Sequence, residues 1–200
     1  CHGGRKKFEG KKNMGPKPYL VPTPIVLCGT YDKNGRADLA TLAWAGICCS
    51  EPPAIQISVR TERYTHEAII ANKEYTVCIP SSDQSAIADY CGMVSGRGAN
   101  KLERAGISSV RGEFVNAPVI KEFPVCLECR LIGSLELGTH DLFVGEVLAS
   151  WVDEKFLDAK GTADLVKLSP IAYAPLPGGG EYYKIGPSAG KSFSVGRSLM

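Results

Sequence analysis

Strand signals joined by tight turns constrain this chain more than any other feature of its sequence. Residues 25–31 are rich in β-forming side chains, the turn signal Asn34-Gly35 follows, and residues 36–45 have the pattern of a partner strand. Residues 125–137 and 142–153 make a second, longer hairpin around the connection 138–141. Closing such hairpins into a barrel removes exposed sheet edges, so the pattern predicts a mainly β, antiparallel barrel.

Shorter elements fill the rest of the predicted barrel. Strands are expected at 54–59 and 74–79, and a helix at 63–73 has Thr65 in the position of an N-cap. Serines and an aspartate at 81–83 cap a second helix at 84–93, and a Gly-broken segment at 95–106 adds a short helical turn. The Pro/Gly-rich stretch 174–180 is expected as a surface loop. These signals predict six or seven strands with two or three short helices.

Length and charge limit the function classes. The 200 residues suffice for one well-buried domain, which we place at residues 14–200, with 1–13 as a flexible leader or expression remnant. The net charge of +2 depends on residues 1–17, which hold six basic and one acidic side chain, leaving 17 basic and 20 acidic elsewhere. This balance predicts no nucleic-acid partner, and the absence of an apolar run near about 18 residues predicts no membrane partner.

The cysteines predict reduced thiols. Eight cysteines without regular spacing or a signal sequence favour a cytoplasmic protein. Cys126 and Cys129 match the CxxC spacing, but residues three apart on a strand point to opposite faces, which argues against a redox dithiol or a zinc site. Adjacent Cys48 and Cys49 are expected to serve core packing or to contribute backbone groups. No metal site is predicted.

The segment 38–65 has the character of a surface for a flat cofactor. Trp44 lies among alanines and a glycine, where backbone N–H groups can approach a planar ring. Thr65 offers a hydroxyl and free amides to a phosphate. The familiar nucleotide, esterase and metalloprotease motifs are missing from the sequence, and it has three histidines. The chemistry is therefore expected to belong to a bound organic cofactor.

Six motifs in order carry a resemblance to a known family. They are TLAWAGICCSEPP, SVRTERYTHEAI, VSGRGANKLERAGI, LGTHDLFVGEV, SPIAYAP and KSFSVGR. With these motifs the chain resembles the flavin reductase-like, FMN-binding split-barrel proteins, and most closely their flavoredoxin-type branch. The resemblance covers residues 15–196.

This resemblance implies a homodimer of split β-barrels, each of about six antiparallel strands of Greek-key type, with noncovalent FMN in a cleft near the subunit boundary. It implies no catalytic side chain, because the chemistry takes place at flavin N5. The implied flavin contacts are Asp38, Thr41, Trp44, Lys101, His140 and Tyr173, with backbone of Ala45, Cys48 and Cys49 at the ring's polar edge, and Ser58, Arg60 and Thr65 at the phosphate.

Each implied contact has an alternative role. Trp44 and Tyr173 also suit a protein core, and Thr65 caps its helix in either case. Lys101 is otherwise a solvated lysine, and His140 an exposed turn residue.

Two positions depart from the family pattern, because Asp38 and Cys78 stand where relatives commonly have Asn. An ionised Asp only accepts hydrogen bonds, whereas Asn also donates them. A carboxylate near the flavin is expected to destabilise its anionic reduced form, by about 1 kcal/mol if the carboxylate is partly solvated, and so to lower the flavin's reduction potential.

The sequence thus predicts an FMN-binding oxidoreductase that passes hydride or electrons through its flavin, as an NAD(P)H-dependent flavin reductase does. Two alternatives stay open. One is a flavoredoxin-type carrier that exchanges electrons with a redox protein partner and has no NAD(P)H activity. The other is a non-catalytic flavin-binding module.

Overall fold

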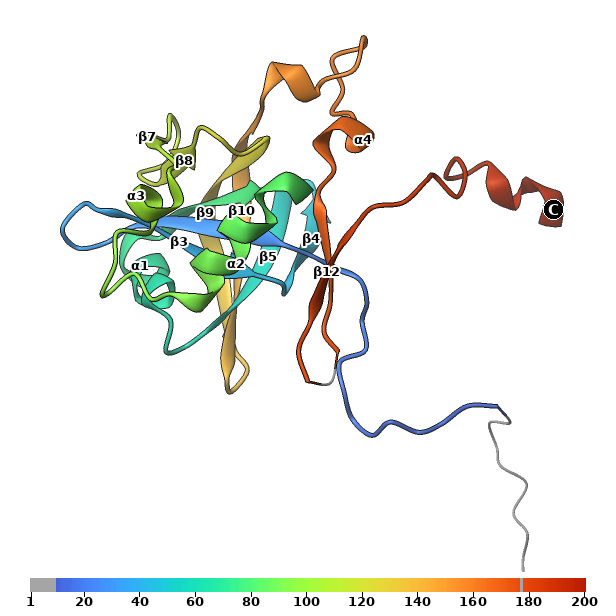
Figure 1. The fold of residues 1–200 in the computed structure, drawn as a ribbon, viewed down its shortest axis with the longest axis horizontal. Coiled ribbons are helices and arrows are strands. Elements are labelled where there is room, and N and C mark those ends of the chain that lie inside the picture. Colours follow the sequence, from blue (N-terminus) through green and yellow to red (C-terminus); the bar gives the residue numbers. More distant parts are fainter. Residues whose placement is uncertain (1–9, 177) are drawn as a thin grey trace, which may run out of the picture.

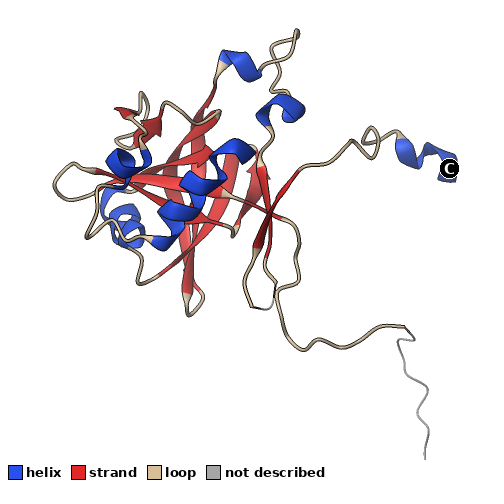
Figure 2. Ribbon diagram, viewed as in Figure 1, coloured by secondary structure: helices blue, strands red, loops and turns tan. Residues whose placement is uncertain are grey.

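An antiparallel seven-stranded sheet forms the centre of the molecule. The structure is a computed structural model that describes residues 10–176 and 178–200 (Figures 1 and 2). Every ladder in the sheet is antiparallel. The strands follow the order β3 (Ala37–Leu42), β2 (Val26–Tyr31), β6 (Glu74–Ile79), β9 (Val125–Glu136), β10 (His140–Val152), β5 (Pro53–Arg60) and β4 (Ala45–Ser50).

The sheet curls so that its two outer strands come together. β3 and β4 lie at opposite ends of the strand order, yet two residues join them in the chain. No ladder pairs them within the part of the chain that the structure describes. The result is a barrel that is split at this corner, as expected. The predicted continuous strand 36–45 is therefore wrong, because the chain turns at 43–44 to cross from one edge of the sheet to the other.

Helices and short strands surround the sheet (Figure 2). The helices are α1 (Tyr64–Asn72), α2 (Ser85–Met93), α3 (Lys101–Ala105) and α4 (Leu165–Leu168), with 3₁₀ turns η1 (Ser82–Gln84), η2 (Glu154–Phe156) and η3 (Val195–Leu199). A three-stranded sheet contains β1 (Thr23–Pro24), β11 (Ile171–Ala174) and β12 (Glu181–Lys184), and a two-stranded sheet contains β7 (Ser109–Arg111) and β8 (Pro118–Ile120). The strands on either side of the Pro/Gly-rich loop were not predicted, and Ala174 belongs to β11 rather than to that loop.

Alternation along the strands builds two apolar layers. Cys126 belongs to a cluster that includes residues of α2 and α3, whereas Cys129 belongs to the cluster that includes Ile69 of α1. This confirms that the CxxC cysteines face opposite sides of β9. Five of the seven cysteines in the described residues are buried, which fits their role as small apolar side chains.

A buried carboxylate anchors the loop between β7 and β8. Glu128 on β9 is fully buried, and one of its oxygens accepts from the N–H of Glu113 at 3.1 Å and from Trp151 Nε1 at 2.6 Å. The other oxygen accepts from the N–H groups of Phe114 and Val115 at 2.7 and 2.9 Å. Burial raises the pKa of Glu128, but these four donors outweigh burial and hold the pKa below its usual value.

The helix predicted at 63–73 begins at Tyr64, and its N-cap is Arg63, not Thr65. Thr65 is the second residue of the helix, and its buried hydroxyl donates to Asp38 instead of capping. In this turn the N–H of His66 donates to the carbonyl oxygen of Arg63 at 3.1 Å, which leaves the N–H groups of Tyr64 and Thr65 without a helical acceptor.

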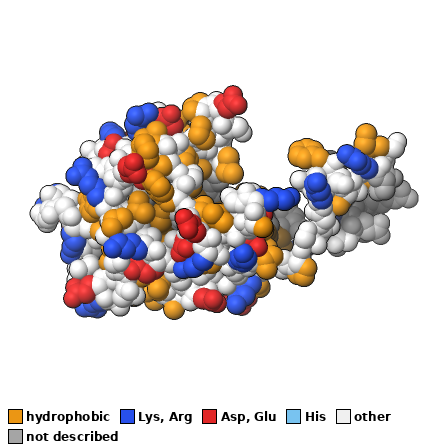
Figure 3. All heavy atoms as spheres, turned by 90° about the horizontal axis from the view of Figure 1, so that it is seen from above, with side chains coloured by type: hydrophobic (Ala, Val, Ile, Leu, Met, Phe, Trp, Pro, Cys, Tyr) orange, Lys and Arg blue, Asp and Glu red, His pale blue; other side chains and the backbone are white. Residues whose placement is uncertain are grey.

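The segments at both ends of the chain extend from the sheet (Figure 1). Residues 11–13 of the predicted leader are exposed, and residues 1–9 lie outside the described residues. On the face seen in Figure 3, basic and acidic side chains are interspersed, and the C-terminal residues stand away from the body. Among the described residues, no helix is both long and apolar enough to span a membrane.

Candidate functional site

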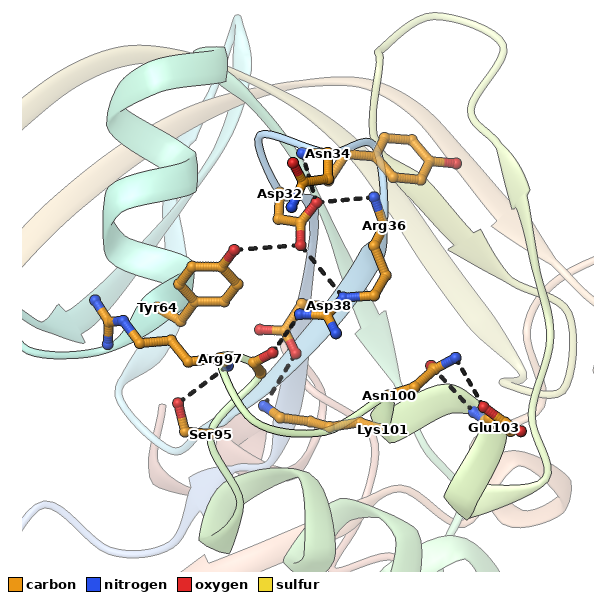
Figure 4. A network of polar contacts seen from close by, with 12 residues as sticks. Asp32, Asn34, Arg36, Asp38, Tyr64, Ser95, Arg97, Asn100, Lys101 and Glu103 are labelled. Carbon is orange, nitrogen blue, oxygen red and sulfur yellow. Dashed lines mark hydrogen bonds and ion pairs between the residues drawn. The ribbon is translucent and has the colours of Figure 1, made fainter.

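Three of the predicted site residues meet in a buried polar cluster. Asp38 on β3 and Lys101 at the start of α3 are each 3% exposed, and Lys101 Nζ lies 3.2 Å from Asp38 Oδ1 (Figure 4). The hydroxyl of Thr65, from α1, donates to Asp38 Oδ2 at 3.4 Å. Sequence reasoning placed all three at the flavin, and the fold brings them together from three separate elements.

The ammonium of Lys101 points into the protein. Besides Asp38, it donates to the carbonyl oxygens of Leu39 and, at 3.3 Å, of Cys91. These three acceptors match the three N–H donors of an ammonium group. Lys101 is therefore not a solvated lysine, and in this arrangement it has no spare donor for a phosphate. Its charge offsets that of Asp38, so the carboxylate acts on its surroundings as half of an ion pair.

A cavity opens beside this cluster at the N-terminus of α1. Its volume is about 310 Å³. Arg63 directs its guanidinium to the carbonyl oxygen of Gly92 at 3.0 Å, which fixes the rim of the cavity. The first-turn N–H groups of α1 and the guanidinium make the region favourable for an anion. The lining residues are Ala40, Glu62, Arg63, Tyr64, Thr65, Val94, Ser95 and Lys101.

A second group of predicted residues follows the adjoining strands. Trp44, half-buried at the corner between β3 and β4, accepts a backbone hydrogen bond of 2.9 Å from the N–H of Ser58. Arg60 ends β5 and lies directly opposite His140 at the start of β10. Arg60 Nε also contacts Glu62 Oε1 at 2.6 Å in an exposed ion pair. Trp44, Ser58, Arg60 and His140 thus form a strip that leads toward α1.

The environment of His140 favours its neutral form. Burial lowers its pKa from an ordinary value near 6.5, and the positive charge of Arg60 lowers the pKa further, against a smaller opposite effect of Glu62. The hydroxyl of Thr139 lies 2.9 Å from His140 Nδ1. Its imidazole can therefore donate one hydrogen bond and accept another.

The edge strand β4 presents its backbone to solvent. It is the last strand of the sheet, so alternate N–H groups point away from β5. The register shifts between Ile47 and Cys49, which leaves Cys48 at a bulge. Ala45 is half-buried, whereas Cys48 and Cys49 are exposed, so the expected core packing of this cysteine pair is wrong. Use of their backbone groups stays a prediction.

Two predicted residues lie apart from these groups. The hydroxyl of Thr41 donates to the carbonyl oxygen of Ala88 in α2 at 2.5 Å. Tyr173 is on β11 in the three-stranded sheet, where its ring centroid lies 5.7 Å from that of Tyr182. The fold thus uses Tyr173 in its own hairpin.

Sequence reasoning missed a buried histidine–carboxylate pair that lies beside both the Asp38 cluster and the strip containing His140. His66 Nε2 lies 2.7 Å from Asp141 Oδ2, with side chains 10% and 13% exposed. The imidazole also packs on Phe143 at a centroid distance of 5.3 Å. His66 follows Thr65 and Asp141 follows His140, so the pair ties together the backbone beside two predicted site residues. Their adjacency to those residues was the available signal.

The largest cavity near the site contains none of the predicted residues. It measures about 790 Å³ and lies between the β2–β3 hairpin and α1. Its polar groups are largely engaged with one another, since Asp32 accepts from Tyr64 at 3.2 Å and from the guanidinium of Arg36 at 3.3 Å (Figure 4). Arg97 also lies over the Tyr64 ring. This cavity is a crevice between packed elements in which Asp32 pairs with Arg36 and Glu67 with Arg97.

Known proteins share this architecture. The family model described as "Flavin reductase like domain" matches residues 19–174. The flavoredoxin of Desulfovibrio vulgaris (Miyazaki F) is 40% identical, with a TM-score of 0.88 over 94% of this chain and 100% of that chain. The flavoredoxin of Methanosarcina acetivorans is 34% identical, with a TM-score of 0.88 over 95% and 99%. Nitrilotriacetate monooxygenase component B of Bacillus cereus is 25% identical, with a TM-score of 0.77 over 84% and 87%.

Proposed function

The chain belongs to the flavin reductase-like family, and on that premise we propose that it is an oxidoreductase that binds FMN noncovalently. One observation carries the proposal. An edge strand that begins with the small residues Ala45 and Gly46 adjoins the strip of Trp44, Ser58, Arg60 and His140, which leads to a cavity at a helix N-terminus. FMN is a flat ring joined by a flexible chain to a phosphate, and these three features match the ring, the chain and the phosphate in that order.

The edge strand fits the ring. Gly46 and Ala45 have little or no side chain, so a planar molecule can approach the backbone closely there. The outward N–H groups of β4 supply donors for the carbonyl oxygens and ring nitrogens of an isoalloxazine. Trp44 closes one end of this surface, and neutral His140 offers a hydrogen bond without adding a charge.

The cavity fits the phosphate. First-turn N–H groups of α1 and the guanidinium of Arg63 supply donors and positive charge. Arg60 lies outside the cavity lining and pairs with Glu62, which lines it, so Arg60 supplies a donor only if this exposed pair opens. We assign Ser58 and Thr65 to the same end of the ligand. Lys101 supports the site from behind, because it neutralises Asp38 and holds β3 against α3.

Bound FMN would supply transfer of one or two electrons or of a hydride. The protein's part is to hold the ring, shield it and fix its hydrogen bonds. The roles that we assign to this chain's residues are binding and orientation, with no side chain acting as acid or base.

We propose NAD(P)H as the electron donor. A flavoredoxin-type carrier is the second candidate, favoured by the likeness to two flavoredoxins. Anaerobic addition of NADH and then NADPH to the FMN-loaded protein separates the two. Rapid bleaching of the visible flavin bands by either nucleotide supports the reductase. A flavin that both nucleotides leave oxidised supports the carrier with a redox protein partner.

We also propose that the protein is a homodimer. Ile47 on β4 is 85% exposed, and Ile132 and Leu135 on β9 are 51% and 57% exposed. Exposed apolar side chains on two strands of one sheet favour an interface. Light scattering after size exclusion tests the dimer, and a mass of one chain contradicts it. The free thiols of the described cysteines support a reducing compartment such as the cytoplasm.

A further inference from the structure

Two buried cysteines from different strands lie against each other. Cys78 on β6 and Cys126 on β9 are direct partners in the antiparallel ladder, and their sulfurs are 2.7 Å apart. Direct partners have Cα atoms about 4.5 or 5.5 Å apart, and both values fall within the range found for disulfides. Both side chains belong to the same apolar cluster. A movement of about 0.7 Å brings the sulfurs to bonding distance.

One of these cysteines borders a small cavity, although its side chain is only 2% exposed. Cys126 is among the residues that line a cavity of about 210 Å³. Its walls are mainly apolar, with Val119, Phe123 and Trp151, and they carry charge at Lys121 and Asp153. Cys78 lies behind Cys126 and is fully buried. Cys126 is therefore the cysteine nearer the cavity, and the Cys78 sulfur is within reach of the Cys126 sulfur.

We propose that Cys78 and Cys126 form a dithiol site that reduces small-molecule disulfides entering this cavity. The Cys126 sulfur attacks one sulfur of the small disulfide, which forms a mixed disulfide and releases one small thiol. The Cys78 sulfur then attacks the Cys126 sulfur and releases the second small thiol. The protein dithiol loses two electrons and two protons, and the small disulfide gains them as two thiols.

The other described cysteines do not offer this arrangement. Cys129 faces the opposite side of β9, in the second apolar cluster. Cys48 and Cys49 are adjacent and exposed on β4. The hydrogen bond to Cys78 and burial raise the pKa of the Cys126 thiol, so the exchange is slow and is best followed to its endpoint. The site is separate from the residues assigned to FMN, and the proposal does not rest on the proposed function.

The test uses the purified full chain, reduced and then freed of reductant under anaerobic conditions. Excess bis(2-hydroxyethyl) disulfide is added, remaining thiols are blocked at the endpoint, and the unreduced protein is digested for mass spectrometry. We expect a peptide pair linked through Cys78 and Cys126. Cys129→Ser is the matched control and retains the link, whereas Cys126→Ser loses it. Cys78→Ser traps the mixed disulfide on Cys126.

Two results overturn the proposal. One is a wild-type digest in which Cys78 and Cys126 stay free while only exposed cysteines carry the small thiol. The other is a trapped mixed disulfide on Cys78 in Cys126→Ser at the yield seen on Cys126 in Cys78→Ser. If a serine variant fails to fold, the wild-type digest alone decides. Protein with and without bound FMN is expected to give the same linked peptide, which keeps this test independent of flavin binding.

Discussion

Replacing Asp38 with Asn leaves the buried ammonium of Lys101 without its counter-charge. At the 3.2 Å separation of the two groups, an effective dielectric constant of about 20 gives about 5 kcal/mol of attraction. Lys101 keeps its carbonyl partners, and breaking one side of a buried ion pair costs roughly 3–5 kcal/mol. For a chain of 200 residues this corresponds to a fall in Tm of about 6–20 °C.

Thermal unfolding of three variants tests this value. Asp38→Asn and Lys101→Met each leave one buried charge unpaired, and the double variant leaves none. We therefore expect the double variant to recover much of the stability that either single variant loses. Losses that simply add, or a loss below about 1 kcal/mol in Asp38→Asn, refute the coupling.

The same variants report on the flavin. Removing the negative charge is expected to raise the two-electron midpoint potential in Asp38→Asn by about 20 mV, the equivalent of about 1 kcal/mol. Lys101→Met is expected to lower it, and the double variant to stay near the wild-type value because the pair is removed as a unit. An unchanged potential in Asp38→Asn shows that this carboxylate does not act on the flavin.

Two further positions give sharp tests. Glu128→Gln places an amide NH₂ against two N–H donors whichever way the amide faces. Urea unfolding should therefore show a fall of about 3–6 kcal/mol in the free energy of unfolding, and a fall below 1 kcal/mol contradicts the anchoring role. Because the folded pKa of Glu128 is lowered, its contribution to stability is present above about pH 4.5 and lost as the pH falls through the folded value, as acid titration of the unfolding free energy should show. His66→Phe keeps the contact with Phe143 but removes the hydrogen bond to Asp141, so the Kd values for FMN and for riboflavin should both rise about tenfold, because the pair lies beside both Thr65 and His140. Unchanged Kd values for both ligands in fluorescence titrations mean that His66 does not position the flavin site.

Local patterns in the sequence predicted the hairpins and the sides of the strands. The turn signal at Asn34-Gly35 lies between β2 and β3, and the long hairpin of β9 and β10 was placed within a few residues. Alternation also put Cys126 and Cys129 on opposite faces, as the structure confirms. These features depend on neighbours in the chain, where periodicity and turn chemistry act directly.

Contacts between residues far apart in the chain could not be predicted from the sequence. Lys101 and Asp38 are 63 positions apart, and the pattern at neither position shows that the ammonium turns inward. The contact between Cys78 and Cys126 depends on the register of β6 against β9, which no local signal specifies. Thr65 illustrates a smaller miss, since a threonine near a helix start suits an N-cap, but the buried carboxylate of Asp38 offers its hydroxyl a better partner.

FMN binding itself is the most direct test of the proposed function. Titration of the flavin-free protein with FMN, followed by flavin fluorescence and the visible spectrum, is expected to saturate at one FMN per chain and leave a yellow protein after gel filtration. A colourless protein that leaves added FMN in the small-molecule fraction contradicts the assignment of β4 and the α1 cavity as a flavin site.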